Sequence, residues 1–267
     1  MNERIIKKVG EQLLIQADCL FELEALESNL FDIVVTSPPY NIGTKYNSFS
    51  DSQDPNKYLE WIFEWASQVN RLMKPDGSFF LNIGSKPTDP STPFWIVTML
   101  LEIFQLQNTF HWIKSITVGE TSTGHYKPIN SKRFVNDCHE YIFHFTKTGE
   151  VELNRLGLGV PYADPSNAKR WASGEGTRCR GNNWFIPYKT IQSKKTRNHP
   201  ATFPIELVEN CLKIHGLDKI KTVLDPFMGT GTTAVACEKL KLKSVGFEID
   251  EFYFKQAVEN VNKEYDK

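Results

Sequence analysis

Two short stretches of the sequence combine residue types that could do chemistry, and the first is Ser37-Pro38-Pro39-Tyr40. It follows an apolar, β-branched run that is typical of a buried strand. Neither proline can donate a backbone hydrogen bond, and each fixes its φ at about −65°, so the chain leaves the strand in a stiff, extended segment. The hydroxyl of Ser37 and the ring of Tyr40 are then held at the carboxyl end of a strand, where open α/β sheets bind ligands. The alternative is an ordinary strand exit with a proline stop.

The second stretch is a turn, residues 225–233, with the sequence Asp-Pro-Phe-Met-Gly-Thr-Gly-Thr-Thr. Its glycines allow tight turning and close approach of the backbone to a ligand. No Gly-Lys-Ser/Thr follows, as a phosphate-binding loop requires, and the carboxylate of Asp225 suits a positive ammonium group rather than a phosphate. Glu248 ends the next strand, where an acidic residue typically accepts hydrogen bonds from both hydroxyls of a ribose. Together the two carboxylates indicate a nucleoside that carries an amino acid, namely S-adenosylmethionine.

The elements that must position these residues alternate between strand and helix patterns. Strand patterns precede Asp18 and occupy residues 31–36, 78–84, 108–116, 139–147, 221–224 and 243–250. Helical spacing of apolar residues, or helix start and stop signals, mark residues 19–26, 54–74, 92–106, 203–216, 233–242 and the segment from 251 onwards. This alternation predicts an α/β fold with a doubly wound, mostly parallel sheet.

On these motifs the chain resembles the amino-methylating DNA methyltransferases over nearly its whole length. Residues 36–43 look like the catalytic motif of that family, and residues 225–233 look like its cofactor motif. Residues 198–209 look like the segment that closes over the methionine end of the cofactor. The catalytic motif comes first, which is the permuted order of the β group. The resemblance implies the S-adenosylmethionine-dependent methyltransferase fold, with residues 1–148 as its catalytic part, 149–198 as an inserted target-recognition region and 199–267 as its cofactor-binding part.

The same resemblance assigns roles to the first stretch. An exocyclic amino nitrogen is a poor nucleophile, because its lone pair is delocalised into the ring. The Ser37 hydroxyl and the Pro38 carbonyl would accept its hydrogens, Pro39 would help to fix that carbonyl, and Tyr40 would stack on a base flipped out of the duplex. Members with Ser-Pro-Pro-Tyr are more often cytosine-N4 enzymes, so we expect that target. Adenine N6 is the alternative, since the following Asn41 is shared with many adenine enzymes.

The resemblance also supplies a cofactor site that draws on five parts of the chain. Asp18 stands where the family has an acidic residue beside the adenine, although Ala17 replaces the usual glycine, and the alternative for Asp18 is a helix N-cap. The residues expected to hold the cofactor are Asp18, Thr36, His199, Pro200, Asp225, Pro226, Phe227, Gly229, Gly231, Thr232, Glu248 and Ile249.

A basic segment with interleaved aromatic residues runs from Lys169 to Arg197, opposed only by Glu175. Basic groups for phosphates together with aromatic rings suit contact with nucleic acid. A second polar loop, residues 124–134, has the same character. The residues expected to face DNA are Lys127, Lys132, Arg133, Lys169, Arg170, Arg178, Arg180, Lys194, Lys195 and Arg197. The alternative is an irregular loop whose aromatic residues, such as Trp184, pack inward and whose charges are merely solvated.

Composition limits the remaining possibilities. A net charge of −1 argues against a protein that coats nucleic acid indiscriminately, and five scattered cysteines favour a reducing cytoplasm without disulfides or a zinc site. We see no signal peptide and no membrane span, and we expect a cytoplasmic monomer or homodimer. Double-stranded DNA is the expected partner, and a cognate restriction endonuclease is a further candidate.

Two rival functions have sequence features that count against them. Methylation of an RNA base or a glutamine side chain is usually carried by Asn-Pro-Pro-Tyr placed after the cofactor motif, and the order here is the reverse. A non-catalytic DNA-binding regulator of the same fold has no need of an intact catalytic set, yet Ser37, Tyr40, Asp225, Gly229 and Gly231 are all present.

Overall fold

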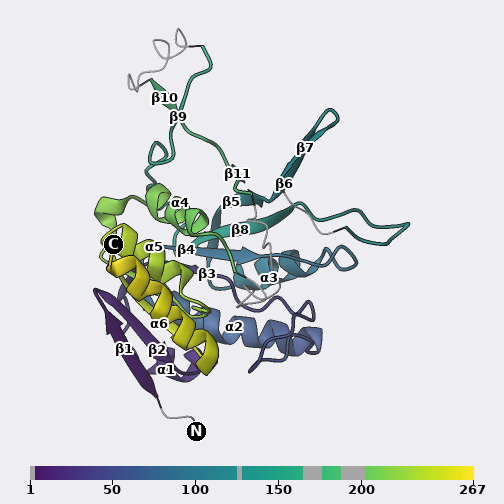
Figure 1. The fold of residues 1–267 in the computed structure, drawn as a ribbon. Coiled ribbons are helices and arrows are strands. Elements are labelled where there is room, and N and C mark those ends of the chain that lie inside the picture. Colours follow the sequence, from purple (N-terminus) through teal and green to yellow (C-terminus); the bar gives the residue numbers. More distant parts are fainter. Residues whose placement is uncertain (1–3, 125–127, 165–175, 188–201) are drawn as a thin grey trace.

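The computed structural model describes residues 4–124, 128–164, 176–187 and 202–267, and its centre is one large mixed sheet (Figure 1). Nine strands form it among these residues. In spatial order they are β1 (Ile5–Val9), β2 (Gln12–Gln16), β13 (Lys243–Glu248), β12 (Thr222–Asp225), β3 (Phe31–Thr36), β4 (Met73–Ile83), β8 (His139–Thr146), β5 (Gln105–Ile113) and β11 (Asn183–Phe185).

The five central strands, from β2 to β4, are all parallel to one another. β1 is antiparallel to β2, and β8 runs antiparallel between β4 and β5. The expected α/β fold with a mostly parallel sheet is therefore confirmed.

Helices cover both faces of the sheet, which explains the continuous apolar run in β3. On one face lie α1 (Cys19–Ala25), α2 (Pro55–Leu72) and α3 (Thr92–Leu100), and on the other lie α4 (Ile205–His215), α5 (Thr232–Lys239) and α6 (Glu251–Tyr265), with a short 3₁₀ helix (Leu217–Lys219) after α4. Val34 packs into the first core, whereas Ile33 and Val35 pack into the second. No helix in the described part of the chain is long and apolar enough to cross a membrane.

The order of the strands creates a binding crevice between β12 and β3, which are neighbours in the sheet. From β12 the chain passes through α5 to β13 on one side, and from β3 it passes through α2 to β4 on the other side. The connections therefore diverge to opposite faces at this point, and ligands of open α/β sheets bind outside the carboxyl ends of the strands at such a switch point.

Some boundaries differ from the sequence prediction, and one difference concerns the segment that was expected to contact DNA. β4 begins at Met73 rather than at residue 78, with an irregular register against β3, and α3 ends at Leu100, so that β5 already begins at Gln105. The unexpected strand β11 lies within the segment taken for the target-recognition region, yet it pairs with β5. Its Trp184 is fully buried, with its ring 4.5 Å from that of Phe110, so at this residue the alternative of inward packing is correct.

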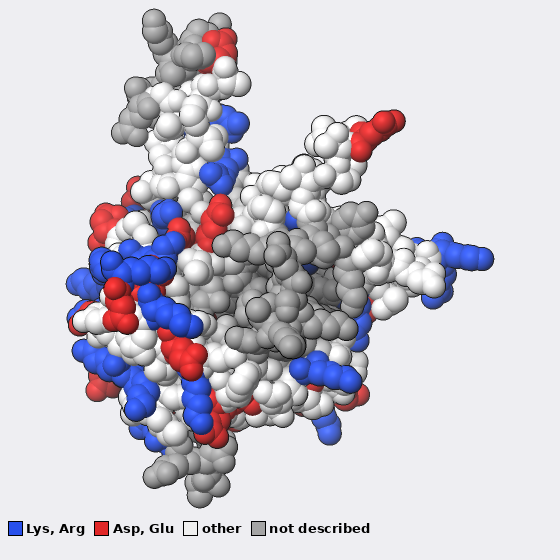
Figure 2. Space-filling model, in the orientation of Figure 1, with Lys and Arg blue, Asp and Glu red and all other residues white. Residues whose placement is uncertain are grey.

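Several segments project from the sheet (Figure 1). One carries the strand pair β9 (Val160–Pro161) and β10 (Thr177–Arg178), and another is the hairpin of β6 (Ser115–Val118) and β7 (Thr121–Gly124). Figure 2 shows Lys and Arg side chains on the β9–β10 projection. The described residues expected to face DNA, namely Lys132, Arg133, Arg178 and Arg180, are all exposed.

Candidate active site

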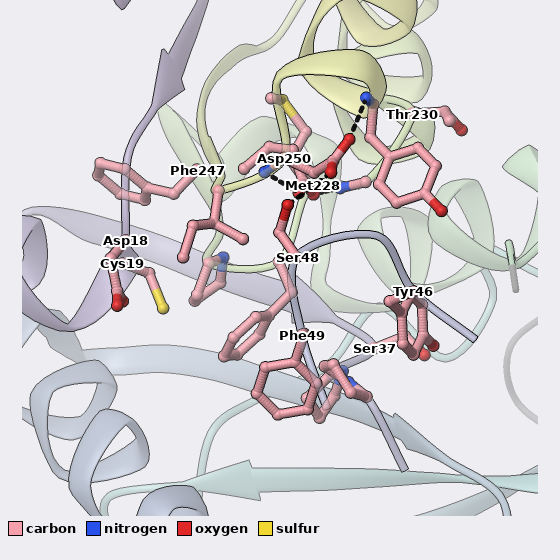
Figure 3. A pocket seen from close by; sticks show the side chains of 18 of the residues that line it. Asp18, Cys19, Ser37, Tyr46, Ser48, Phe49, Met228, Thr230, Phe247 and Asp250 are labelled. Carbon is pink, nitrogen blue, oxygen red and sulfur yellow. Dashed lines mark hydrogen bonds between the residues drawn. The ribbon is translucent and has the colours of Figure 1, made fainter. Parts of the chain in front are cut away.

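A pocket lies at the carboxyl ends of β2, β3, β12 and β13, where the fold creates the crevice. The segments that follow these four strands are far apart in the sequence and meet in its wall (Figure 3). The sequence-predicted residues that line it are Asp18, Ser37, Pro38, Pro39, Tyr40, Pro226, Phe227, Gly229, Thr232, Glu248 and Ile249. The two stretches with chemical potential therefore share one cavity, as the topology of a parallel sheet requires.

The Ser37-Pro38-Pro39-Tyr40 stretch is held in place from several sides. The hydroxyl of Tyr58, on α2, donates a 2.8 Å hydrogen bond to the Pro39 carbonyl oxygen. The Ser37 and Tyr40 hydroxyl oxygens lie 2.7 Å apart. Beyond the stretch, the buried carboxylate of Asp51 accepts the backbone N–H of Asn41 at 2.7 Å, which fixes the loop that follows. The stretch is therefore a fixed part of the pocket wall rather than a loosely held loop.

Glu248 lies at the end of β13 with its carboxylate anchored by the backbone. Its Oε2 accepts the N–H of Gly229 at 2.8 Å, and its Oε1 accepts the N–H of Asp250 at 2.8 Å. Burial raises the pKa of Glu248 to about 7. Because a carboxylate oxygen can accept more than one hydrogen bond, both oxygens retain capacity for donors of a ligand.

Asp225 does not lie where the sequence led us to expect it. It is 2% exposed, below the pocket wall rather than in it. Its Oδ1 accepts the hydroxyl of Thr36 at 2.7 Å and the N–H of Phe227 at 3.1 Å, and its Oδ2 accepts the hydroxyl of Thr233 at 2.6 Å. The carboxylate joins the end of β3 to the start of α5, and its oxygens accept hydroxyl groups of the protein below the pocket wall.

Thr36 and Gly231 are two further predicted cofactor residues that support the pocket from behind. Thr36 is fully buried and donates to Asp225. Gly231 has a φ of +84°, and a Cβ there would lie 3.0 Å from the Cβ of Ala257. This glycine therefore permits both the turn before α5 and the close packing of α6.

Asp18 is the helix N-cap that the sequence offered as one alternative, and its contact with the adenine stays a prediction. Its Oδ1 accepts the N–H of Leu20 at 3.0 Å, which makes it the N-cap of α1, and it also lines the pocket.

Part of the wall was not foreseen from the sequence. The loop of residues 46–49 closes against the pocket, because the hydroxyl of Ser48 donates to Asp250 at 2.7 Å (Figure 3). Phe49 and Phe227 both pack on Trp61, with ring centroids 5.1 and 5.3 Å apart. Among these unforeseen residues, only Asp250 had a recognisable sequence signal, because an aspartate before a helix is a common N-cap.

Several predicted residues fall outside the described part of the chain. These are His199 and Pro200 of the expected closing segment, and Lys127, Lys169, Arg170, Lys194, Lys195 and Arg197 of the expected DNA-facing set. Thr202 and Phe203, which belong to the same expected closing segment, do line the pocket.

The charge of the wall indicates what kind of ligand fits. Three carboxylates line it, those of Asp18, Glu248 and Asp250, and no Lys or Arg is found among its described lining residues. Phe247 and Ile249 add apolar surface beside Glu248. Such a wall suits a cationic ligand with a ribose and a flat base, and it disfavours a polyphosphate, so S-adenosylmethionine fits the residues present.

Comparison with known proteins gives a consistent result. The family model of the N6/N4 DNA methylases matches residues 31–259. The Type II methyltransferase M.HpaI of Haemophilus parainfluenzae is 27% identical over 258 residues, which cover 96% of this chain and 76% of that protein.

Two solved structures share the fold. The PvuII DNA methyltransferase, named as cytosine-N4-specific, is 20% identical with a TM-score of 0.70, over 97% of this chain and 93% of that one. TTHA0409 of Thermus thermophilus, in complex with S-adenosyl-L-methionine, is 21% identical with a TM-score of 0.62, over 96% and 95% of the two chains. With the family model matched across both motifs, the chain belongs to the DNA methylases that methylate exocyclic amino groups, enzymes that use S-adenosylmethionine as methyl donor.

Proposed function

We propose that this enzyme methylates the N4 amino group of cytosine at specific sites in DNA. The observation that carries the proposal is the serine that begins the Ser-Pro-Pro-Tyr stretch, in the wall of the same pocket as the cofactor motif. Within the family this serine is more common among cytosine-N4 enzymes, whereas the adenine-N6 enzymes usually have aspartate there. The PvuII enzyme, whose name states cytosine N4, has the same fold.

The chain's own residues then have distinct tasks in the reaction. The Ser37 hydroxyl and the Pro38 carbonyl accept the hydrogens of the target amino group, which draws the nitrogen towards a tetrahedral, more nucleophilic geometry. The ring of Tyr40 stacks on the flipped base and orients it. Holding the nitrogen in line with the methyl group accounts for much of the acceleration, because it removes the entropic cost of alignment.

The cofactor would be held by the opposite wall. Glu248 would accept hydrogen bonds from the ribose hydroxyls, and Asp18 and Ile249 would hold the adenine. When bound, S-adenosylmethionine would supply a methyl group that is activated by the positive charge of the sulfonium. The acidic wall would favour the binding of that charge.

The target base is tested by product analysis. Purified protein, unmethylated genomic DNA and isotopically labelled S-adenosylmethionine should give labelled N4-methylcytosine after digestion to nucleosides and mass spectrometry. Labelled N6-methyladenine instead would overturn the choice of cytosine while leaving the enzyme class intact. The absence of any labelled nucleoside, with DNA from several sources, would contradict DNA methylation itself.

The projecting part of residues 149–198 is proposed to face DNA, together with the loop that contains Lys132 and Arg133. Arg178 and Arg180 are exposed, and the only side-chain hydrogen bond found for Arg178 in the described region goes to the Cys179 carbonyl. Replacing both arginines with alanine should weaken DNA binding and reduce the slope of log Kd against log salt by about 2, because fewer counterions are released. A double variant with the wild-type slope would assign both arginines to the fold. The control is Arg4→Ala, which removes an exposed arginine that is distant from both in the sequence.

A further inference from the structure

A chain of hydrogen bonds leads from the Ser37-Pro38-Pro39-Tyr40 stretch to a carboxylate on another strand. The Tyr40 hydroxyl donates to Oε2 of Glu140, on β8, at 2.9 Å. The Asn82 amide nitrogen, on β4, lies 2.9 Å from the Tyr40 oxygen and 2.8 Å from the same Glu140 oxygen. Lys114 donates to Oε1 of Glu140 at 3.0 Å. Nothing in the sequence motifs pointed to Glu140, Asn82 or Lys114.

The chemistry of these groups fixes the direction of every proton in the chain. The carboxylate of Glu140 can only accept, so Asn82 turns its NH₂ towards it, and the same NH₂ donates to the Tyr40 oxygen. Tyr40 has a single hydroxyl proton, which it donates to Glu140. The 2.7 Å bond between Ser37 and Tyr40 must therefore be donated by Ser37.

This direction matters because a serine hydroxyl can serve either as a donor or as an acceptor. With its proton committed to Tyr40, Ser37 has only lone pairs left for the pocket that it lines. An acceptor is what the hydrogens of an exocyclic amino group require. A freely rotating Ser37 would spend part of its time with its own proton pointed at that amino group.

The Glu140 end of this hydrogen-bond chain is held firmly in place. Glu140 is paired with Lys114, and their side chains are only 16% and 21% exposed. A Cβ at Gly84 would lie 3.0 Å from the ring of Tyr40 and 3.2 Å from Cγ of Glu140, so the absence of a side chain there lets both groups pack together. Burial, and after it the carboxylate of Glu140, raises the pKa of Tyr40 well above its usual range, so Tyr40 keeps the proton that it donates.

We propose that Glu140 is a positioning residue, which acts through Tyr40 to order the Ser37 hydroxyl as an acceptor for the target amino group. The proposal rests on the proposed function and adds to it a residue that touches neither the base nor the cofactor. Glu140 holds the Tyr40 proton, Tyr40 holds the Ser37 proton, and the lone pairs of Ser37 are thereby directed at the substrate.

The test measures the rate of single-turnover methylation of DNA at saturating cofactor. It asks whether substitutions at Glu140 and Tyr40 affect that rate independently of each other. Glu140→Leu should lower the rate about fivefold with unchanged affinity for S-adenosylmethionine, since a transition-state contact is disordered and not removed. Glu140→Gln, which still offers Tyr40 an oxygen acceptor, should recover most of that loss. Tyr40→Phe keeps the ring for stacking but breaks the chain, so the double variant Y40F/E140L should be no slower than Y40F alone.

The outcomes separate this proposal from the proposed function. If the wild-type enzyme methylates DNA but E140L does so at the wild-type rate, the role of Glu140 is refuted. It is equally refuted if the losses in Y40F and E140L multiply, because Glu140 would then not act through Tyr40. If E140L does not fold, Y40F decides alone, and a wild-type rate for Y40F overturns the proposal. Glu64→Leu, which removes an exposed carboxylate on α2, is the control and should leave the rate unchanged.

Discussion

Replacing Ser37 with alanine should lower the single-turnover rate of DNA methylation on the order of 10- to 100-fold, while the affinity for S-adenosylmethionine stays unchanged. In the proposed mechanism, the hydroxyl accepts a hydrogen of the target nitrogen, and this interaction strengthens as that nitrogen becomes tetrahedral. The wall proposed to hold the cofactor is formed by other segments, among them the one that ends in Glu248. The measurement uses enzyme in excess over a methylatable duplex, with cofactor saturating, and calorimetry for the cofactor affinity.

A matched control for Ser37→Ala is Ser67→Ala. Ser67 lies on α2, and its hydroxyl donates to the Phe63 carbonyl of the same helix at 2.7 Å, outside the pocket. This variant should methylate at the wild-type rate. If Ser37→Ala did so too, with its fold intact, the stretch would be only a strand exit and the proposed mechanism would be wrong.

Replacing Glu248 with glutamine should weaken the binding of S-adenosylmethionine on the order of 10- to 100-fold at pH 8. Glutamine has nearly the same shape, but it loses the charge that favours a cationic ligand. Its NH₂ group would also face one of the two backbone N–H donors, of Gly229 or Asp250, that the carboxylate now accepts. Equilibrium calorimetry without DNA isolates this effect from catalysis.

The wild-type affinity should also depend on pH in a direction that the burial of Glu248 fixes. Burial raises the pKa of Glu248 to about 7, and the ionised form is the better acceptor for hydroxyl groups and the better partner for a cation. Below pH 7, binding of S-adenosylmethionine must also displace a proton from Glu248. Each unit by which the pH falls therefore weakens binding by up to about tenfold. Above pH 7 the carboxylate is already ionised, and the affinity levels off.

Two comparisons make the Glu248 prediction specific. The E248Q variant has no carboxyl to titrate at this position, so its affinity should vary much less between pH 6 and pH 8. Glu251→Gln, which alters a carboxylate that is 62% exposed at the start of α6, should preserve both the affinity and its pH dependence. A wild-type affinity that was flat across this range would contradict the raised pKa of Glu248. Wild-type affinity in E248Q would show that Glu248 does not bind the cofactor.

The two chemical stretches, and their places at the carboxyl ends of strands, followed from the sequence alone. Ser37 and Glu248 each stand directly after an apolar run, and runs of that kind form parallel strands whose carboxyl ends lie along one edge of the sheet. The spacing of Tyr58, Ile62, Trp65, Val69 and Leu72 also predicted the buried face of α2 correctly. These inferences are local, because a strand, a turn or a helix face is encoded by residues close together in the chain.

The segment of residues 149–198 shows where local patterns become insufficient. Its basic and aromatic composition predicted one region for DNA contact, but β11 joins the central sheet and Trp184 packs into the core. A short strand of three residues has no distinctive period, and a tryptophan has the same identity whether it stacks on a base or on Phe110. Burial depends on which partner arrives from elsewhere in the chain.

Only the tertiary structure revealed the contacts of Asp225 and Glu140. From the sequence, Asp225 was a carboxylate at a ligand-binding turn, but the hydroxyls of Thr36, 189 positions away, and of Thr233 occupy its oxygens below the pocket. Glu140 stands 100 positions after Tyr40, on a strand inserted antiparallel into the sheet, and carried no motif of its own. A sequence reveals which groups can donate or accept hydrogen bonds, whereas the direction of each bond depends on neighbours that only the folded chain brings within 3 Å of one another.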